Sequence, residues 1–570
     1  MTPSSLCTAL LFLLSLTSAI ASPAQTVKTF STLLSFDGSD GETPAYLASL
    51  VQGLDGNLYG TTHAGGANSN GTVFKITPAG TLTTLYNFCA QANCTDGKSP
   101  EATLALATNG TFYGTTFLGG STGCDSGDFS CGTVFKITPS GALTTLHGFD
   151  GNDGGNPSGG LVEAANGTFY GTTHGGGSSS NCKNVGGCGT IFKITPAGTL
   201  TTLYSFCAQA NCTDDAFPGG LVLATNGNFY GTTGGLSGDC GSGGCGTVFK
   251  ITPSGTLTTL HRFDGTDGND PSVGLVQGTD GNFYGTTRGG GATGNGTVFK
   301  ITPSGTLTTL HSFDVTDGSL PDAILVQGTD GDFYGTTTYG GGSNCSNSCG
   351  TVFKITPSGT FTTQHSFDGI DGSNPSAGLI QATNGAFYGA TSSGGSSNNC
   401  SGGCGTVFSL SVGLAPLVKT LPTSGKPGAK VIILGNNLKG ATSVTFNGTK
   451  ATFTILSVSD MSTTVPVGAT TGTVKVVTPS GTLSSNVKFQ VVPTILSFSP
   501  TGGSVGTSVT INGEVFTGAT TVTFGGVKGT INSVSYTKIM ATVPSGAKTG
   551  KITVTTPGGI ATSSATFTVP

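Results

Sequence analysis

Five copies of a short acidic motif are the most obvious candidates for chemistry in the sequence. They read FDGSDG, FDGNDG, FDGTDG, FDVTDG and FDGIDG, and each places two aspartates three positions apart. Closely spaced carboxylates can hold calcium, which accepts flexible cages of oxygen ligands. The same pattern suits a tight turn, in which aspartate accepts hydrogen bonds from its own backbone. Because each copy lacks the further ligands of an EF-hand loop, we expect turns and keep calcium as the alternative. The ten residues are Asp37, Asp40, Asp150, Asp153, Asp264, Asp267, Asp314, Asp317, Asp368 and Asp371.

Histidine and glutamate do not form an evident catalytic set. A catalytic base is normally one residue that its neighbours set apart, whereas the histidines recur at equivalent places, which favours packing or hydrogen bonding between repeats. Glutamate is scarce, and no pair suggests the two carboxylates of a glycosidase. Two matches to G-x-S-x-G, at 119–123 and 502–506, lack the helix that a nucleophile elbow requires. The recurring histidines are His147, His261, His311 and His365 at one position, and His63 and His174 at another.

Cysteine usage indicates an exported protein. Apart from Cys7, the cysteines fall into seven short-range pairs, and local pairing in an exported chain favours disulfides over zinc, which needs four ligands together. The predicted disulfides are Cys89–Cys94, Cys124–Cys131, Cys182–Cys188, Cys207–Cys212, Cys240–Cys245, Cys345–Cys349 and Cys400–Cys404.

The N-terminus and the composition support export. An apolar run from Leu6 to Leu16 ends in a small-x-small site, so residues 1–21 are interpreted as a signal peptide. No later segment approaches the length of a membrane helix. Only 9% of residues are charged and the net charge is -5. A nucleic-acid partner is therefore not expected, because phosphate binding needs clustered basic residues.

A repeat of 50 to 60 residues fills the first two thirds of the chain. A YGTT or YGAT element occurs seven times, each followed by a GT[VI]F element. Four strand-like runs per repeat, joined by DG, NG, PSG or PAG turns, are typical of a propeller blade. The last repeat lacks its fourth run, and residues 28–36 match that run. We therefore predict an all-β protein with a seven-bladed β-propeller over residues 22–412, closed by the N-terminal strand.

The last third contains two related modules. Pro422, Gly435 and Phe446 recur 78 residues later as Pro500, Gly513 and Phe524. Alternating Val, Thr and Ile runs punctuated by Gly and Pro predict two immunoglobulin-like β-sandwiches, at 413–492 and 493–570.

Both parts resemble known families. The segment PTILSFSPTGGSVGTSVTINGEVFTGATTVTFGG resembles the TIG/IPT family of immunoglobulin-like domains, and the first module shares the pattern but departs from it at Leu438 and Asn447. The unit DGNFYGTT followed by GTVFKITPSGTLTTLHSF resembles the GloVer-type, or choice-of-anchor, repeat of exported bacterial proteins. That resemblance implies a secreted or surface protein.

The expected function is recognition rather than catalysis. We predict a monomeric, secreted or cell-surface protein without cofactor, whose disulfide-stapled loop face binds an extracellular glycan or protein. The alternative is an enzyme that acts on extracellular polysaccharide at the central funnel of the propeller. Such an enzyme needs an acid or base outside the repeat pattern, and aromatic rings for sugar stacking. The candidates are Asp215, Asp239, Asp270 and Asp322, and the rings are Tyr86, Tyr204 and Tyr339.

Overall fold

The protein is built almost entirely of β-strands. The computed structural model describes residues 28–44, 48–120, 131–179, 182, 186–235, 245–342 and 349–570. Within these ranges the helical elements are two short 3-10 turns, η1 (Ala92–Cys94) and η3 (Ala210–Cys212). The all-β prediction is confirmed. No helix in the described ranges is long and apolar enough to cross a membrane. The predicted signal peptide, residues 1–21, lies outside them.

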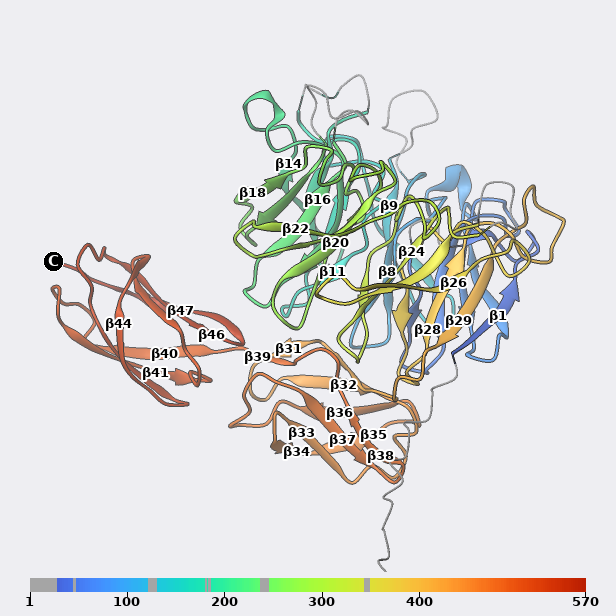
Figure 1. The fold of residues 1–570 in the computed structure, drawn as a ribbon. Helices are drawn as coiled ribbons and strands as arrows, with labels where there is room; N and C mark the ends of the chain where they lie inside the picture. Colours follow the sequence, from blue (N-terminus) through green and yellow to red (C-terminus); the bar gives the residue numbers. More distant parts are fainter. Residues whose placement is uncertain are drawn as a thin grey trace, which may run out of the picture.

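Each repeat forms one antiparallel sheet, and seven such sheets occur in the described part of residues 28–411 (Figure 1). The strands are joined in simple up-and-down order, and β2 (Glu42–Pro44) adds to the first sheet by pairing with β4. In order, the sheets are β3 (Val51–Gln52), β4 (Leu58–Ala64), β5 (Thr72–Ile76) and β6 (Leu82–Asn87); β7 (Ala105–Leu106), β8 (Phe112–Thr116), β9 (Thr133–Ile137) and β10 (Leu143–Gly148); β11 (Val162–Glu163), β12 (Phe169–Thr173), β13 (Thr190–Ile194) and β14 (Leu200–Ser205); β15 (Pro218–Leu223), β16 (Phe229–Thr233), β17 (Thr247–Ile251) and β18 (Leu257–Arg262); β19 (Val276–Gln277), β20 (Phe283–Thr287), β21 (Thr297–Ile301) and β22 (Leu307–Ser312); β23 (Val326–Gln327), β24 (Phe333–Thr337), β25 (Thr351–Ile355) and β26 (Phe361–Ser366); and β27 (Ile380–Gln381), β28 (Phe387–Thr391), β29 (Thr406–Ser411) and β1 (Thr29–Ser35).

Steric contacts explain why the same glycine and phenylalanine recur in the YGTT and GTVF elements of the repeat. In the fifth sheet, a Cβ on Gly285 of the YGTT element would lie 2.7 Å from Phe299 and 2.8 Å from Leu275. Glycine at this place therefore lets the phenylalanine of the GTVF element pack directly over the neighbouring strand. Gly281 in the turn between the first two strands has φ +86°, which glycine adopts without strain.

Neighbouring sheets pack through contacts that recur at several junctions. A tyrosine of one sheet packs against a phenylalanine of the next, as in Tyr284 and Phe333, whose ring centroids are 3.9 Å apart. A glutamine of the next sheet also accepts a hydrogen bond from a threonine N–H of the preceding one, as Gln381 does from Thr329 at 3.1 Å. These contacts fix the spacing of the sheets.

The last sheet contacts the first through a phenylalanine pair and the same kind of glutamine hydrogen bond. The N-terminal strand β1 pairs antiparallel with β29 and supplies the fourth strand of the last sheet. Phe36, which follows β1, packs against Phe74 of the first sheet with ring centroids 5.3 Å apart. Gln52 of the first sheet accepts a hydrogen bond from the Thr383 N–H at 3.0 Å. Residues more than 300 positions apart are thereby joined.

Two sandwiches follow the seven sheets. Each has two four-stranded sheets connected in the same order, and the first has an additional parallel pair, β31 and β39. The first sandwich contains β30 (Lys419–Leu421), β31 (Ser424–Gly425), β32 (Lys430–Leu434), β33 (Ser443–Phe446), β34 (Thr449–Ala451), β35 (Phe453–Ile455), β36 (Asp460–Thr464), β37 (Val474–Thr478), β38 (Gly481–Ser484) and β39 (Gln490–Val491), and the second contains β40 (Thr494–Ser499), β41 (Ser508–Glu514), β42 (Thr521–Phe524), β43 (Val527–Lys528), β44 (Thr530–Val534), β45 (Lys538–Thr542), β46 (Gly550–Thr556) and β47 (Gly559–Phe567).

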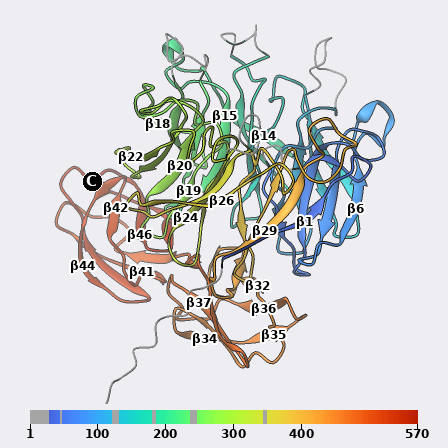
Figure 2. The ribbon, with the colours of Figure 1, turned by 45° about the vertical axis from the view of Figure 1, so that its right-hand side comes forward.

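One side of the seven sheets carries the short DG, NG, PSG and PAG turns and is called the tight-turn side. The first sandwich docks on this side. Figures 1 and 2 both place it beneath them, and Figure 1 places the second sandwich to one side. The Ser459 hydroxyl donates to the Leu54 carbonyl at 2.8 Å, and the Leu417 N–H donates to the Thr383 carbonyl at 3.0 Å. Leu421 and Leu434 of the sandwich pack in the cluster between the first two sheets. Among the described residues, these hydrogen bonds between the sandwich and the sheets lie on the tight-turn side.

Candidate functional site

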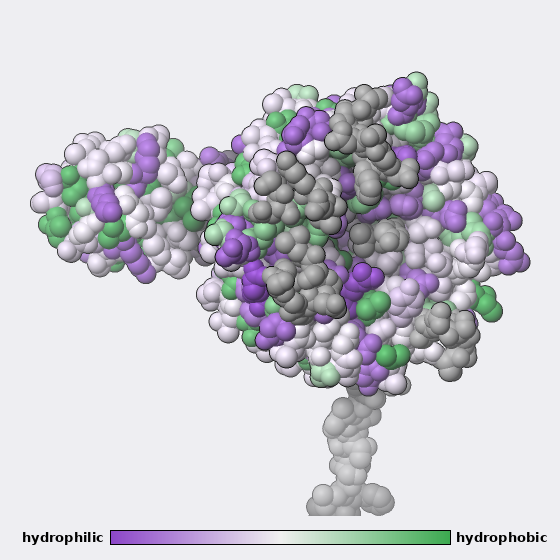
Figure 3. All heavy atoms as spheres, turned by 90° about the horizontal axis from the view of Figure 1, so that it is seen from above, coloured by the Kyte–Doolittle hydropathy of each residue, from purple (hydrophilic) through white to green (hydrophobic). Residues whose placement is uncertain are grey.

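The side opposite the tight turns carries the longer loops and is called the long-loop side. A pocket of about 720 Å³ opens there, where six consecutive repeats meet. Its walls are the segments just before the first strand and just after the second strand of each repeat. Seen from above, the surface of the seven sheets is mainly hydrophilic or neutral, with hydrophobic residues scattered over it (Figure 3). The lining comprises Glu101, Phe117, Ser158, His174, Phe217, Pro218, Gly234, Gly235, Asp270, Ser272, Val273, Arg288, Asp322, Thr338, Tyr339, Asn374, Ser376, Ser392 and Ser393.

The pocket is lined by the positions at which the repeats differ. The residue directly after the YGTT or YGAT element is different in nearly every repeat, although its surroundings barely change. Its N–H donates to the carbonyl of the residue before a repeated proline, as Arg288 does to Asp270 at 3.1 Å. Asp270 itself has φ +53°, a left-handed conformation that is uncommon for residues other than glycine. The seven residues after this element are His63, Phe117, His174, Gly234, Arg288, Thr338 and Ser392, and all of them except His63 line the pocket.

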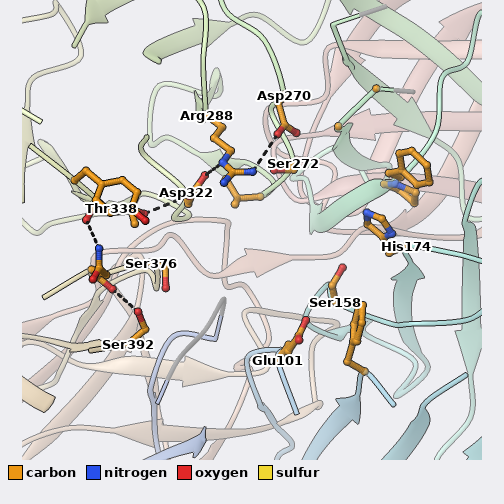
Figure 4. A pocket seen from close by; sticks show the side chains of 18 of the residues that line it. Glu101, Ser158, His174, Asp270, Ser272, Arg288, Asp322, Thr338, Ser376 and Ser392 are labelled. Atoms are coloured by element: carbon orange, nitrogen blue, oxygen red, sulfur yellow. Dashed lines mark hydrogen bonds and ion pairs between the residues drawn. The ribbon is translucent and has the colours of Figure 1, made fainter. Parts of the chain in front are cut away.

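An arginine lies between two partly buried carboxylates on one side of the pocket (Figure 4). Arg288 Nε is 3.4 Å from Asp322 Oδ1, and Arg288 Nη1 is 3.9 Å from Asp270 Oδ2. The Thr338 hydroxyl donates to Asp322 Oδ2 at 3.2 Å. Burial raises the pKa of Asp322 to about 6, although Arg288 opposes the shift. Burial also raises the pKa of Asp270, again opposed by Arg288. Perturbed carboxyls in a pocket are typical of functional sites.

The other side of the pocket presents His174, Glu101 and Ser158 (Figure 4). His174 stacks on Phe217 with ring centroids 4.6 Å apart, and burial lowers the pKa of its imidazole. At neutral pH this ring is therefore uncharged and can both donate and accept a hydrogen bond. Glu101 Oε1 lies 3.0 Å from Nδ1 of His63.

The predicted aspartate pairs form turns at the junctions between sheets. In each, the first carboxylate accepts the N–H of the second aspartate, and the second carboxylate accepts the N–H of the first. Asp264 Oδ1 also accepts the Thr266 hydroxyl at 2.7 Å, and Asp267 Oδ2 lies 2.7 Å from His261 Nε2. His147, His311 and His365 pair with their junction aspartates in the same way. Both oxygens of these four second aspartates are thus already engaged, and calcium binding stays a prediction.

Four of the predicted cysteine pairs are disulfides in the described residues. They are Cys89–Cys94, Cys182–Cys188, Cys207–Cys212 and Cys400–Cys404. Cys131, Cys245 and Cys349 are also disulfide-bonded, and their predicted partners Cys124, Cys240 and Cys345 lie outside the described residues.

Only some of the residues chosen from sequence for a funnel enzyme line the pocket. Asp270, Asp322 and Tyr339 line it. Asp215 is fully buried near Arg262 instead, with Asp215 Oδ2 3.9 Å from Arg262 Nη1. The other candidates are accounted for separately: the Tyr86 hydroxyl donates to Asp96, the Tyr204 hydroxyl donates to Asp214, and Asp239 lies outside the described residues.

Sequence reasoning missed Arg288 and Glu101 and assigned His174 to packing. The sequence did contain a signal, which is variation at one position of an otherwise regular repeat. Residues at such a position are not constrained by the packing that keeps the neighbouring positions constant. The sequence alone does not show that the position after the YGTT or YGAT element faces a cavity.

The chain belongs to the Gloeobacter/Verrucomicrobia repeat family. That family matches residues 20–242, 122–349 and 218–456, and an IPT/TIG domain matches residues 493–569. The predicted resemblances are confirmed, with one TIG domain found rather than two. No curated protein matches the chain.

Three of the solved structures that this chain resembles do so at a low TM-score. A surface glycan-binding protein of Prevotella bryantii is 21% identical over 27% of this chain and 38% of its own, with a TM-score of 0.21. A fungal alcohol oxidase of the AA5 family is 12% identical over 82% of this chain and 100% of its own, with a TM-score of 0.42. A protein from Bacteroides thetaiotaomicron assigned as a phosphatase is 30% identical over 14% of this chain, with a TM-score of 0.13, and the chain spans only 18% of its length.

Proposed function

We propose that residues 22–412 form a closed seven-bladed β-propeller and that residues 413–492 form a second TIG-like domain. Closure is supported by β1, which completes the last sheet, and by the contacts of Phe36 and Gln52 across the junction of the last and first sheets. The second proposal is supported by the strand order that the two sandwiches share.

The propeller is proposed to belong to a secreted recognition protein that binds an extracellular glycan in the long-loop pocket. One observation carries this proposal: three charged residues that break the repeat, Asp270, Arg288 and Asp322, lie together in one cavity. Arg288, Asp270 and Asp322 offer charged hydrogen-bonding groups to sugar hydroxyls. Phe217 and Tyr339 offer rings against which a sugar face can pack. Secretion is supported by the disulfides, which persist in oxidising compartments. The sandwiches would serve as spacers or as partner-binding arms.

A hydrolytic enzyme in the same pocket is the second candidate, and Asp322 is the observation in its favour. A carboxyl with a pKa of about 6 is protonated in mild acid and can act as a general acid, while a neighbouring carboxylate remains ionised. Asp270, on the other side of Arg288, would be the partner carboxyl, and burial raises its pKa as well.

Incubation of the protein from Ser22 onward with bacterial and plant polysaccharides separates the two candidates. Bound protein and released oligosaccharides are both followed by mass spectrometry. Recognition predicts retention without products. It also predicts that Arg288→Met lowers retention at least tenfold, while the control Lys136→Met, at a lysine of β9 that does not line the pocket, has no effect. Products that accumulate with time, and that disappear in Asp322→Asn, would establish the enzyme instead.

A further inference from the structure

A second cavity, of about 430 Å³, lies on the tight-turn side between the seven sheets and the first sandwich. The sheets contribute the short first strands β3, β23 and β27, and the sandwich contributes β30, β32 and residues 485–487. The walls are mostly aliphatic, with Leu50, Val51, Leu379 and Ile380 on the sheet side and Leu434 on the sandwich side. Cavities of roughly 300–1,000 Å³ with such walls are typical of small-molecule sites.

Lys419 is the one ionisable residue in the lining of this cavity. It belongs to β30, where Lys419 and Leu421 share a face, and Leu421 packs against the cluster between the first two sheets. No hydrogen bond or ion pair of the Lys419 side chain occurs among the described residues, so the ammonium group has no anionic neighbour there. Burial without compensation lowers the pKa of Lys419 to about 8. The residue is partly buried, so its ammonium group keeps some access to water but loses part of its hydration, and a counter-charge would offset that loss.

We propose that this cavity binds an amphiphile with one negative charge, such as a medium-chain carboxylate. The carboxylate would pair with the Lys419 ammonium group, with Ser485 and Asn486 as further polar neighbours. The hydrocarbon chain would lie against Leu379, Ile380 and Leu434. Entry is available at Val487, whose residue surface is 51% exposed.

The choice of an anion follows from charge complementarity. A neutral hydrocarbon would fill the aliphatic part and leave the ammonium group unpaired, while a cation would meet a like charge. Only an anion would favour the charged form of Lys419 in this partly buried place. The opposing possibility is that Lys419 lays its methylene stem along the apolar wall and keeps its ammonium group in water. That possibility predicts no preference among head groups.

Calorimetric titration of the full protein from Ser22 with decanoate, decanol and decyltrimethylammonium tests the proposal. We expect decanoate to bind at one site, at least tenfold more tightly than decanol, and the cation to bind most weakly. Lys419→Met, which keeps the length and apolar volume of the side chain, should remove the preference for decanoate. Lys426→Met, at an exposed lysine of the same sandwich, should keep it. Equal affinities for decanoate and decanol, or an unchanged preference in Lys419→Met, would overturn the proposal.

A second measurement uses the unmodified protein and does not depend on the folding of any variant. Trace acetylation with acetic anhydride, followed by peptide mass spectrometry, reports the reactivity of each lysine. Decanoate should reduce the acetylation of Lys419 several-fold and leave Lys426 unchanged. Acetylation of Lys419 that decanoate does not alter would contradict the site.

Discussion

Asp322 in the pocket and Asp264 in a junction turn carry the same carboxyl group, yet the fold moves their pKa values in opposite directions. Burial raises the pKa of Asp322 to about 6. Hydrogen bonds from the Thr266 hydroxyl and backbone lower the pKa of Asp264, which is almost fully exposed. The first residue breaks the repeat and the second follows it. Repeated acids therefore stabilise turns, whereas the acids outside the repeat are held in an environment that costs folding energy.

The different environments of Asp322 and Asp264 depend on the packing of the sheets that position the pocket. The largest expected effect tests this packing. Phe36→Ala removes a fully buried ring that packs on Phe74 between the last and first sheets. Phe149→Ala removes the equivalent ring on Phe192 between the second and third sheets, at the same centroid distance of 5.3 Å. Each change should lower the free energy of unfolding by about 3–5 kcal/mol in urea denaturation. If Phe36→Ala lowers the free energy of unfolding by less than half as much as Phe149→Ala, the last sheet is not packed against the first and the propeller is not closed.

The pH dependence of stability is the next largest effect. The pKa of Asp322 is about 6 in the folded chain and about 3.9 when unfolded, so its protonated form favours folding. This contribution is complete below about pH 4 and is lost as the pH rises through about 6. Asp322→Asn removes that loss. Relative to the natural protein, the variant should gain about 2–3 kcal/mol between pH 4 and pH 7.

Asp264→Asn is the control of opposite sign. Because the pKa of Asp264 is lowered in the folded chain, its contribution is present above about pH 4 and lost as the pH falls. The stability of this variant relative to the natural protein should therefore fall as the pH rises through that range. Urea denaturation from pH 3.5 to 7.5 measures both. Parallel pH profiles for the natural protein and Asp322→Asn would show that Asp322 ionises normally.

Most of the fold could be predicted from the sequence, because every repeat contains the same strand-like runs separated by the same turn motifs. The spacing of the YGTT and GTVF elements gives the second and third strands of each sheet, and the DG and PSG turns give their connections. Residues 28–36 match the missing fourth strand, and β1 is found there. These features are local or repeated, so each copy supports the others.

The sites could be predicted only in part, because they depend on side chains from different repeats. Asp270 and Asp322 were candidates as acids outside the pattern, but Arg288 joins them only once two adjacent sheets are packed. His174 shares its position with His63, and that recurrence concealed its place in the pocket. Lys419 had no signal in the sequence, since its burial arises from docking of the sandwich against the sheets.

The smallest expected effect concerns calcium at the repeated acids. Four of the five junctions have a histidine on the second aspartate, but the fifth, Asp37 and Asp40, has Leu34 at the equivalent place. Because the backbone and the histidines already occupy these carboxylates, 5 mM calcium or a chelator should change the melting temperature by less than about 1 °C. A larger rise with calcium would indicate a cation at the junctions. Leu34→His would then abolish the rise if the junction without histidine is the site, and would leave it intact if the four histidine-paired junctions bind the ion.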